Sequence, residues 1–304
     1  MRYQLATLFI ALFAGFGQTV SAESASGQGR IRASALEEAG LAQASLAVAF
    51  VESRTETGSA GSGRTVEDAG SGVLVTPCHI MTARHVLGPK PSGGSKETRS
   101  FTVSLPAAVH DGGTVSGFSS QTATLAVEGG QRRTRRNALL DDWAFLELQV
   151  PVLGNRTVKV FDQTCCTPRA LRAALAGFPI DKSDTASPEM WIDPECAVIE
   201  KLANRMIAID CEATSGNSGG PLMVLTEDGW RLAAILTRAP SPGAKGSGVG
   251  FEKFAIPVDR FLKRQIAGLE NACARRLEPG LTQILEHVPG GRPLTRIAEK
   301  ETQS

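Results

Sequence analysis

One serine of this chain lies in a stretch that could hold a nucleophile. Ser218 follows Gly216 and Asn217 and precedes Gly219 and Gly220, in the sequence GNSGGP. Glycine accepts backbone angles that other residues avoid, so this turn could aim the backbone N–H groups of Gly216 and Ser218 at one point. Two converging amide donors are what a developing oxyanion requires. An ordinary surface turn has a similar composition, so this stretch alone leaves both interpretations open.

A serine hydroxyl needs a neighbouring base, and the chain has four histidines that could take this role. His85 is the candidate, because it follows the strand-like HIMTA and would lie at a tight turn at the strand end. A buried core histidine is the alternative. We expect His110, in a turn, and His287, near the C terminus, to be solvated. The fourth histidine, His79, shares the segment of His85.

The base in turn needs an acid that orients it. Asp141 and Asp142 directly precede the apolar run WAFLEL, where a carboxylate could be shielded and still accept hydrogen bonds. Two surface aspartates at the start of a strand are the alternative interpretation.

The elements that must position these residues are predicted to be strands. Short apolar and β-branched runs, separated by Gly, Pro, Asp and Ser, begin at Ser45 and form two sets of similar size, which predicts an all-β protein with two β-subdomains. After Pro257, apolar residues recur at helical spacing and predict one C-terminal helix. These residues are Val258, Phe261, Leu262, Ile266 and Leu269.

The N terminus resembles an export signal. Arg2 precedes the apolar run LATLFIALFAGF, and a small-residue site ends at Ala22, which predicts a signal peptide over 1–22. An uncleaved anchor is the alternative. No other run is long and apolar enough to span a bilayer, so we expect a secreted or periplasmic protein that is free of the membrane after cleavage. Residues 23–44 are small and polar, which is typical of a pro-segment or flexible lead-in.

The six cysteines indicate disulfides, because their number is even and the chain is expected to be exported. Cys196 and Cys211 flank a hairpin-like segment, and we expect them to pair. The other expected partners are Cys165 and Cys166 with Cys78 and Cys273. No CxxC pair is present and histidines are few, so we expect no zinc or other metal site and no cofactor.

The charge of the chain does not indicate that it binds nucleic acid. The net charge is +1, and the one basic cluster lies in a loop-like stretch. This cluster could bind an anionic partner, but we favour a solvated loop open to proteolysis. It consists of Arg132, Arg133, Arg135 and Arg136.

Three motifs taken together resemble the trypsin-like serine proteases. TARHVL, DDWAFLEL and GNSGGPL are similar to the histidine, aspartate and serine boxes of that family and occur in the same order. The resemblance covers about residues 45 to 265. It implies His85 as base, Asp142 as orienting acid, Ser218 as nucleophile, and the amides of Gly216 and Ser218 as oxyanion hole. It also implies an exported serine endopeptidase acting through an acyl-enzyme on protein or peptide substrates.

The same resemblance implies the domain layout. We expect two six-stranded antiparallel β-barrels of chymotrypsin type within residues 45–268, divided near residues 155–170. Residues 269–304 are then a polar C-terminal tail, and the protein is expected to be a monomer.

Within the family, the bacterial glutamyl-endopeptidase and HtrA branch is the most similar. Arg84, AGFP at 176–179, Asn217 and FAIPVDRF at 254–261 carry this likeness, whereas the residues after the helix are too few for a PDZ domain. Animal trypsins have an aspartate at the position of Asn217, which receives a freshly cut N terminus. We therefore expect no activation by insertion of a new N terminus.

Glu212 lies six residues before Ser218, where trypsin-like enzymes place the floor of the side-chain pocket. A carboxylate there would favour Lys or Arg substrates, unless Glu212 points to solvent. No histidine lies near AAILTRA, so glutamate specificity is not expected. The other expected pocket residues are Ala213, Ser215, Leu236 and Thr237.

Two rival functions remain at this stage. A protease-like binding protein without catalysis would carry the same boxes. An esterase of α/β-hydrolase type would share G-x-S-x-G, but its catalytic residues run in the order Ser, acid, His, and it needs helices between strands. The order here is His, Asp, Ser, which disfavours the esterase.

Overall fold

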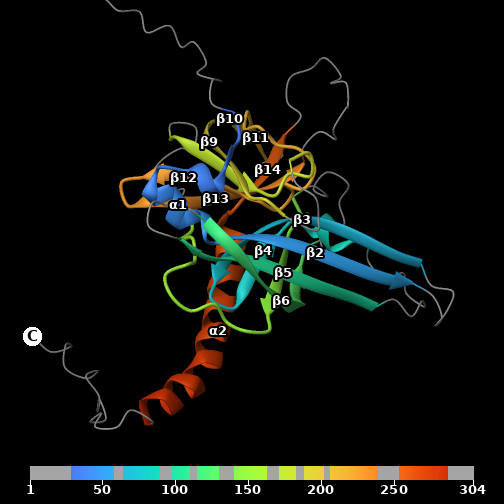
Figure 1. Cartoon of the computed structure of the whole chain (residues 1–304), viewed down its shortest axis with the longest axis vertical. Helices are drawn as coiled ribbons and strands as arrows, with labels where there is room; N and C mark the ends of the chain where they lie inside the picture. The colour runs from blue at the N-terminus through green and yellow to red at the C-terminus, as the bar shows by residue number, and fades with distance from the viewer. Residues whose placement is uncertain are drawn as a thin grey trace, which may run out of the picture.

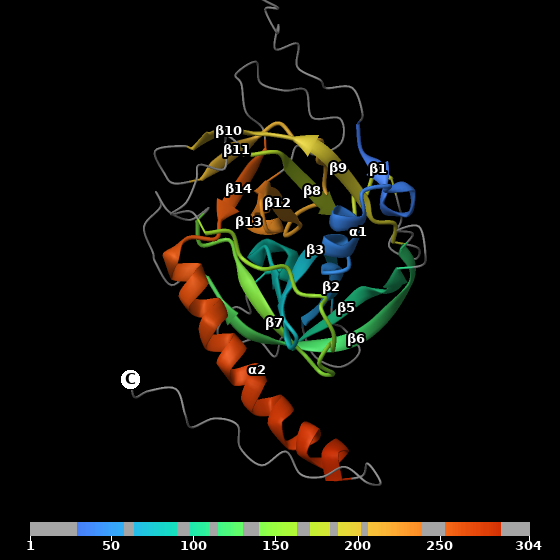
Figure 2. The same cartoon turned by 90° about the vertical axis from the view of Figure 1, so that its left-hand side faces the viewer.

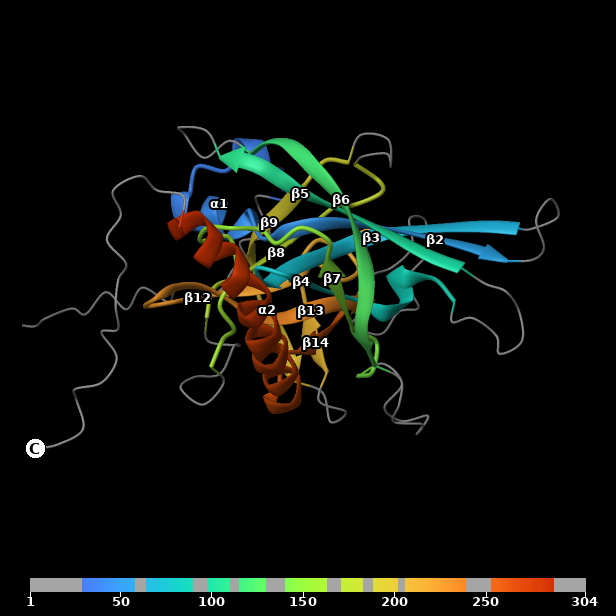
Figure 3. The same ribbon diagram turned by 90° about the horizontal axis from the view of Figure 1, so that it is seen from below.

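The first half of the protein is a closed barrel of six antiparallel strands (Figure 1). The computed structural model describes residues 29–57, 64–89, 98–109, 115–129, 140–162, 171–182, 188–201, 206–238 and 253–286. The barrel has the strand order β2-β3-β4-β7-β6-β5. Its strands are β2 (Val48–Thr57), β3 (Arg64–Thr76), β4 (His79–Thr82), β5 (Thr98–Val109), β6 (Val115–Glu128) and β7 (Ala144–Leu148). Figure 3 shows β2 and β3 extending beyond the rest of the described chain.

The second half is a sheet of eight strands in the order β1-β9-β8-β12-β13-β14-β11-β10. Among the described residues no pairing joins its two end strands, so it forms a half-barrel rather than the expected closed six-stranded barrel. The all-β, two-part fold of chymotrypsin type with a C-terminal helix is confirmed. The strands are β1 (Ile31–Arg32), β8 (Ala173–Gly177), β9 (Trp191–Cys196), β10 (Val198–Lys201), β11 (Ile207–Ile209), β12 (Pro221–Thr226), β13 (Gly229–Arg238) and β14 (Phe254–Pro257).

The segment before the first barrel is folded onto the second sheet. After β1 it forms a 3-10 turn, η1 (Ala33–Ala35), and a short helix, α1 (Ala39–Ser45). Ile31 pairs with Ile192 of β9, and the Ala33 amide donates to the carbonyl of Met190 at 2.9 Å. The described part of the expected lead-in is therefore attached to the protein body and adds an edge strand to the sheet.

One apolar cluster extends across both halves, and a second lies within the second half. Phe50 of β2 and Phe178, directly after β8, are both buried, and their ring centroids lie 5.3 Å apart. Burial of aromatic rings is a large apolar contribution to stability. This contact lies at the junction where the catalytic residues are expected.

Helix α2 (Arg260–Glu286) runs from the second sheet along the flank of the first barrel (Figure 2). Asp259 caps it, because its carboxylate accepts the amides of Phe261 at 2.9 Å and Leu262 at 3.1 Å. The helix was predicted, but the domain boundary expected after residue 268 falls inside it. Arg276 donates to the Leu148 carbonyl at 2.8 Å, so this part of the expected tail is attached to the barrel.

Two disulfides connect parts of the described chain. The predicted Cys196–Cys211 bond is present with an S–S distance of 2.13 Å. The expected partners of Cys78 and Cys273 were wrong, because these two cysteines bond each other at 2.02 Å. The reason is that α2 carries the buried Cys273 to the turn before β4.

Several sequence predictions fall outside the described residues. They are the signal peptide, the arginine cluster, Cys165, Cys166, His110 and His287. In the part of the chain that the structure describes, no helix combines the length and apolarity needed to cross a membrane.

We predict that the Cys78–Cys273 bond holds α2 on the barrel. The double variant Cys78→Ala/Cys273→Ala should lose about 2–5 kcal/mol of unfolding free energy, the usual cost of removing a native disulfide. Amide hydrogen exchange along α2 should also become faster, because the helix loses its covalent attachment. Denaturant titration and exchange measured by mass spectrometry test both effects.

The matched control is Cys196→Ala/Cys211→Ala, which removes the disulfide of the second sheet and should leave exchange in α2 unchanged. Unchanged stability and exchange in the Cys78→Ala/Cys273→Ala variant would contradict the prediction.

Candidate active site

His85 lies on the 3-10 turn η2 (Arg84–Leu87), directly after β4. Its ring nitrogen Nδ1 is 2.7 Å from Oδ2 of Asp142, and its backbone amide donates to Oδ1 at 2.9 Å. The Asp142 carboxylate is buried, whereas the His85 side chain is 48% exposed. One shielded carboxylate therefore orients both the ring and the backbone of an accessible histidine.

Asp142 is held in place by both halves of the protein. It precedes β7, whose pairing with β4 sets Ala144 opposite Thr82 and brings the aspartate beside η2. The amide of Arg84 donates to the Asp142 carbonyl at 3.2 Å. From the second sheet, the Thr237 hydroxyl donates to Oδ2 of Asp142.

Thr237 was expected in the substrate pocket, and it also makes a contact that the sequence did not indicate. Its hydroxyl donates to the Asp142 carboxylate. No local motif marks this role, because it depends on the packing of β13 against the first barrel.

The turn around Ser218 requires its glycines. Gly216 has φ +90° and Gly219 has φ +85°. A Cβ at Gly216 would lie 2.3 Å from the carbonyl oxygen of Phe178, and one at Gly219 would lie 2.1 Å from that of Ser71. Both positions combine a left-handed backbone with close contact to another chain segment, so only glycine fits.

The Ser218 turn packs against the segment that carries His85. A Cβ at Gly219 would also lie 2.7 Å from the amide nitrogen of Ala83, two residues before His85. The Ser71 amide of β3 donates to the Ser218 carbonyl at 2.8 Å. The structure therefore brings His85, Asp142 and the turn of Ser218 to the junction of the two halves.

The second sheet binds the same turn from the other side. The Gly219 amide donates to the Leu236 carbonyl at 2.6 Å, and the Leu236 amide donates to the Gly220 carbonyl at 2.9 Å. Leu236 was expected to line the substrate pocket; it is fully buried and precedes Thr237 on β13. Consecutive residues of one strand thus contact the serine turn and the orienting acid.

Two amides of the turn have no acceptor within the described chain. These are the N–H groups of Gly216 and Ser218, the expected oxyanion donors. The buried Asn217 between them is fully engaged, since its side-chain oxygen accepts the Thr214 amide at 3.1 Å and its own amide donates to the Thr214 carbonyl at 3.2 Å. Asn217 therefore stabilises the turn through neutral hydrogen bonds.

The remaining expected pocket residues precede Gly216 in the chain. They are Glu212, Ala213 and Ser215. Ala213 is buried, and the Ser215 carbonyl accepts the amide of Ile180 at 2.8 Å. The Glu212 side chain is 57% exposed, and its Oε2 accepts the backbone amide of Arg30 at 2.9 Å. Sequence reasoning did not select Arg30, which belongs to the lead-in.

His79 is buried at the start of β4, at the opposite end of this strand from His85. Its Nδ1 is 2.8 Å from the Thr76 hydroxyl, and burial lowers the pKa of its ring. The one group of possible metal ligands among the described residues is Cys196, Asp210 and Cys211. Both sulfurs of that group are in the disulfide, so no thiolate is available there.

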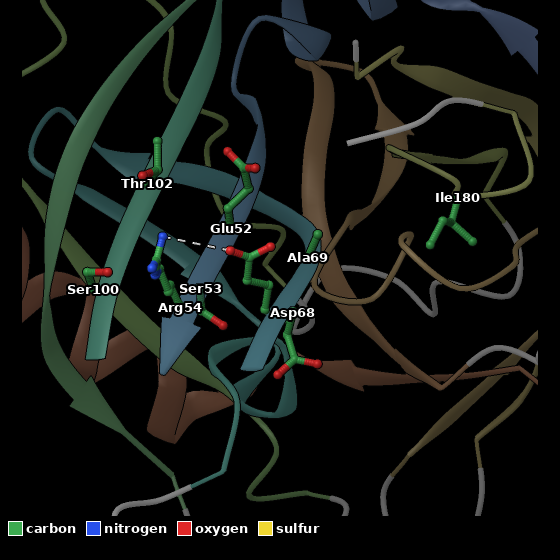
Figure 4. A pocket seen from close by; sticks show the side chains of 9 residues that line it. Glu52, Ser53, Arg54, Asp68, Ala69, Ser100, Thr102 and Ile180 are labelled. Carbon is green, nitrogen blue, oxygen red and sulfur yellow. Dashed lines mark ion pairs between the residues drawn. The ribbon is translucent and has the colours of Figure 1, made fainter. Parts of the chain in front are cut away.

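A cavity of about 330 Å³ opens beside the site (Figure 4). It is connected to the η2 turn, because the Ser53 hydroxyl donates to the Val86 carbonyl at 2.8 Å. Three of its residues are acidic and one is basic. Nη1 of Arg54 lies 3.9 Å from Oε1 of Glu67, and the dashed line in Figure 4 marks this ion pair. Its lining residues are Glu52, Ser53, Arg54, Glu67, Asp68, Ala69, Ser100, Thr102 and Ile180.

The charges of this cavity affect one of its carboxyl groups. Burial and the nearby charge of Glu67 raise the pKa of Glu52 above its ordinary value. With three acidic residues and one basic residue, the cavity lining is acidic overall and lies next to the η2 turn that carries His85.

Comparison with known proteins supports the fold and the family. No curated protein sequence matches the chain. Among solved structures, a Glu endopeptidase in complex with MPD has a TM-score of 0.54 at 16% identity and covers 81% of this chain and 98% of its own. The crystal structure of Deg5 has a TM-score of 0.44 at 18% identity and covers 74% of this chain and 89% of its own. At these identities, the first likeness supports the fold alone.

The family assignment comes from the sequence. A profile of the trypsin-like peptidase domain matches residues 70–235, which is more than half of the chain and includes His85, Asp142 and Ser218. By this match, the protein belongs to the trypsin-like peptidase family.

Proposed function

We propose that this protein is an exported serine endopeptidase that hydrolyses peptide bonds through an acyl-enzyme. The observation that carries the proposal is the buried Asp142 carboxylate, which binds both the ring and the backbone of His85 where the Ser218 turn packs. Membership of the trypsin-like peptidase family supports the same reaction class.

The proposed reaction uses His85 as a proton carrier. With its Nδ1–H donated to Asp142, the ring keeps Nε2 free to accept a proton. Nε2 takes the proton of the Ser218 hydroxyl as Oγ attacks the substrate carbonyl carbon, and then gives it to the leaving amine. Water next attacks the acyl-enzyme, gives its proton to Nε2, and releases the second product as Ser218 regains its hydrogen.

The amides of Gly216 and Ser218 would stabilise the oxyanion formed in each step. Their lack of acceptors among the described residues and the left-handed Gly216 support this role. Such donors act without reorganisation, because the backbone already holds them in place.

The proposal includes no lysine or arginine pocket at Glu212. This carboxylate accepts the Arg30 amide and is more than half exposed, which matches the alternative in which it faces solvent.

Two disulfides support the export part of the proposal. Cys78–Cys273 and Cys196–Cys211 would persist in an oxidising compartment and be reduced in most cytosols. We therefore propose a secreted or periplasmic location.

We predict that Ser218→Ala abolishes covalent labelling by a fluorophosphonate probe, which reacts with activated serines. The wild-type protein should be labelled under conditions in which trypsin is labelled, and its peptidase activity should disappear with the label. Circular dichroism of both proteins provides the folding control. Absence of labelling in the folded wild type would overturn the proposed function and favour a non-catalytic binding protein.

A second prediction concerns the orienting acid. Asp142→Asn should lower kcat by about 10⁴-fold, because an amide no longer selects the right histidine tautomer. Thr237→Val removes one donor to the same carboxylate and should lower kcat about tenfold, as expected for a lost hydrogen bond to a charged group. Steady-state kinetics on one peptide substrate measures both.

The matched control for Thr237→Val is Thr237→Ser, which keeps the hydroxyl and should retain most activity. Equal activities of the valine and serine variants would show that the hydroxyl does not act on Asp142.

A third prediction follows from the raised pKa of Glu52. A carboxyl whose pKa is higher in the folded state than in the unfolded state destabilises the fold as pH rises through these two values, and the penalty is fully present above both. Glu52→Gln should therefore increase stability at pH 7, by a fraction of a kcal/mol because the site is partly exposed, and have little effect at pH 3.

Denaturant titrations at the two pH values test this effect. The control is Glu56→Gln, on the same strand, whose carboxylate is 3.1 Å from the Arg54 Nε and which should gain no stability at pH 7. A larger gain for Glu52→Gln at pH 3 than at pH 7 would contradict the argument.

A further inference from the structure

Arg30 is a charged side chain that is almost fully buried at the start of the described chain. It lies directly before β1, and its side chain is 8% exposed. A guanidinium so shielded from water is tolerated when acceptors replace its hydration. Its partners therefore indicate what it does.

The first partner is Asp181, in the turn after β8. Nη2 of Arg30 donates to Oδ2 at 2.7 Å and Nη1 donates to Oδ1 at 3.0 Å, which makes a bidentate ion pair. The hydrogen bond from Arg30 lowers the pKa of Asp181 to about 2. The pair therefore stays charged at pH values well above 2.

The other partners lie in the segment that leads to Ser218. Nη1 of Arg30 also donates to the Thr214 hydroxyl at 3.3 Å, and this hydroxyl donates to Asp181. The Arg30 amide binds Glu212, and its Nε lies 3.7 Å from the same carboxylate oxygen. Arg30 thus connects the lead-in, the turn after β8 and the residues before Gly216.

These contacts continue directly into the proposed oxyanion turn. Thr214 exchanges two hydrogen bonds with Asn217, the residue between the two proposed donors. Next to Asp181, the Ile180 amide donates to the Ser215 carbonyl at 2.8 Å. Displacement of Asp181 or Thr214 would therefore shift the backbone on both sides of Gly216.

We propose that Arg30 is a positioning residue that holds the Gly216–Ser218 turn in its oxyanion-binding shape. This inference rests on the proposed function and adds to it a requirement for the lead-in. Arg30 acts through Asp181, Thr214 and Glu212 and touches no reacting atom. The positive charge of Arg30 is on its side chain and does not require a free N terminus. The contacts of Arg30 therefore form whether or not the chain is cut before Gly29.

The test compares Arg30→Gln with Arg32→Gln in the full chain. Arg32 lies two residues further along the chain, in β1, but its side chain is 59% exposed and faces Glu189 with Nε 3.4 Å from the carboxylate. Arg30→Gln should lower kcat by about tenfold to hundredfold with little change in KM, because a small misplacement of catalytic groups affects the transition state most. Arg32→Gln should stay within about twofold of wild type.

A transition-state analogue separates a positioning role from a loss of stability. The affinity for a peptide boronic acid, whose tetrahedral adduct needs the oxyanion donors, should fall in Arg30→Gln by the same factor as kcat/KM. Titration of active sites with a fluorophosphonate at saturation should still count nearly all molecules. Wild-type kcat per titrated site in Arg30→Gln would overturn the proposal, since the loss would then reflect unfolded protein.

Asp181→Asn is the second variant, and it tests the positioning role of the Arg30–Asp181 pair if Arg30→Gln does not fold. It should reproduce the fall in kcat, and Arg30→Lys should recover part of the activity. Wild-type kcat in Asp181→Asn would overturn the inference. An inactive wild-type protein would overturn the proposed function itself, whereas an active wild type with an unimpaired Arg30→Gln would overturn the inference alone.

Discussion

The arrangement of the candidate active site depends on a single buried carboxylate. Asp142 accepts the amide and the ring nitrogen of His85 from the first barrel and the Thr237 hydroxyl from the second sheet. A buried charge is stable only when several donors surround it, so the three donors must remain in place together. These donors come from both halves, so the carboxylate is one of the points at which the halves contact each other.

The turn around Ser218 is also held by hydrogen bonds from both halves, but here the bonded groups are backbone amides and carbonyls. Its carbonyls and amides bind Ser71 of β3 on one side and Leu236 of β13 on the other. Since Leu236 precedes Thr237, one strand positions the orienting acid and the turn at once. Gly219 allows the turn to approach β3 closely and Gly216 allows it to approach the segment after β8, which no residue with a Cβ could do at the distances found.

What could be read from the sequence was mostly local. The residues around His85, Asp142 and Ser218 carry their own turn and strand patterns, and Cys196 and Cys211 are only 15 residues apart. The Cys78–Cys273 bond spans 195 residues and depends on where α2 packs, which no local pattern specifies. The edge strand β1 has two residues, too few for a strand pattern, and the roles of Arg30 and Thr237 exist only after the halves have packed.

The charges of the lead-in contacts lie apart from Asn217, the residue directly before the proposed nucleophile. Asn217 is 1% exposed and binds Thr214 through neutral hydrogen bonds, so no ion has to be desolvated there. The ion pair lies further out, where Asp181 is 26% and Glu212 57% exposed and water can share the hydration of the carboxylates. Arg30 reaches this outer position because β1 pairs with β9 and fixes the chain beside it. Charge is thereby kept at the rim of the turn, and neutral groups form its interior.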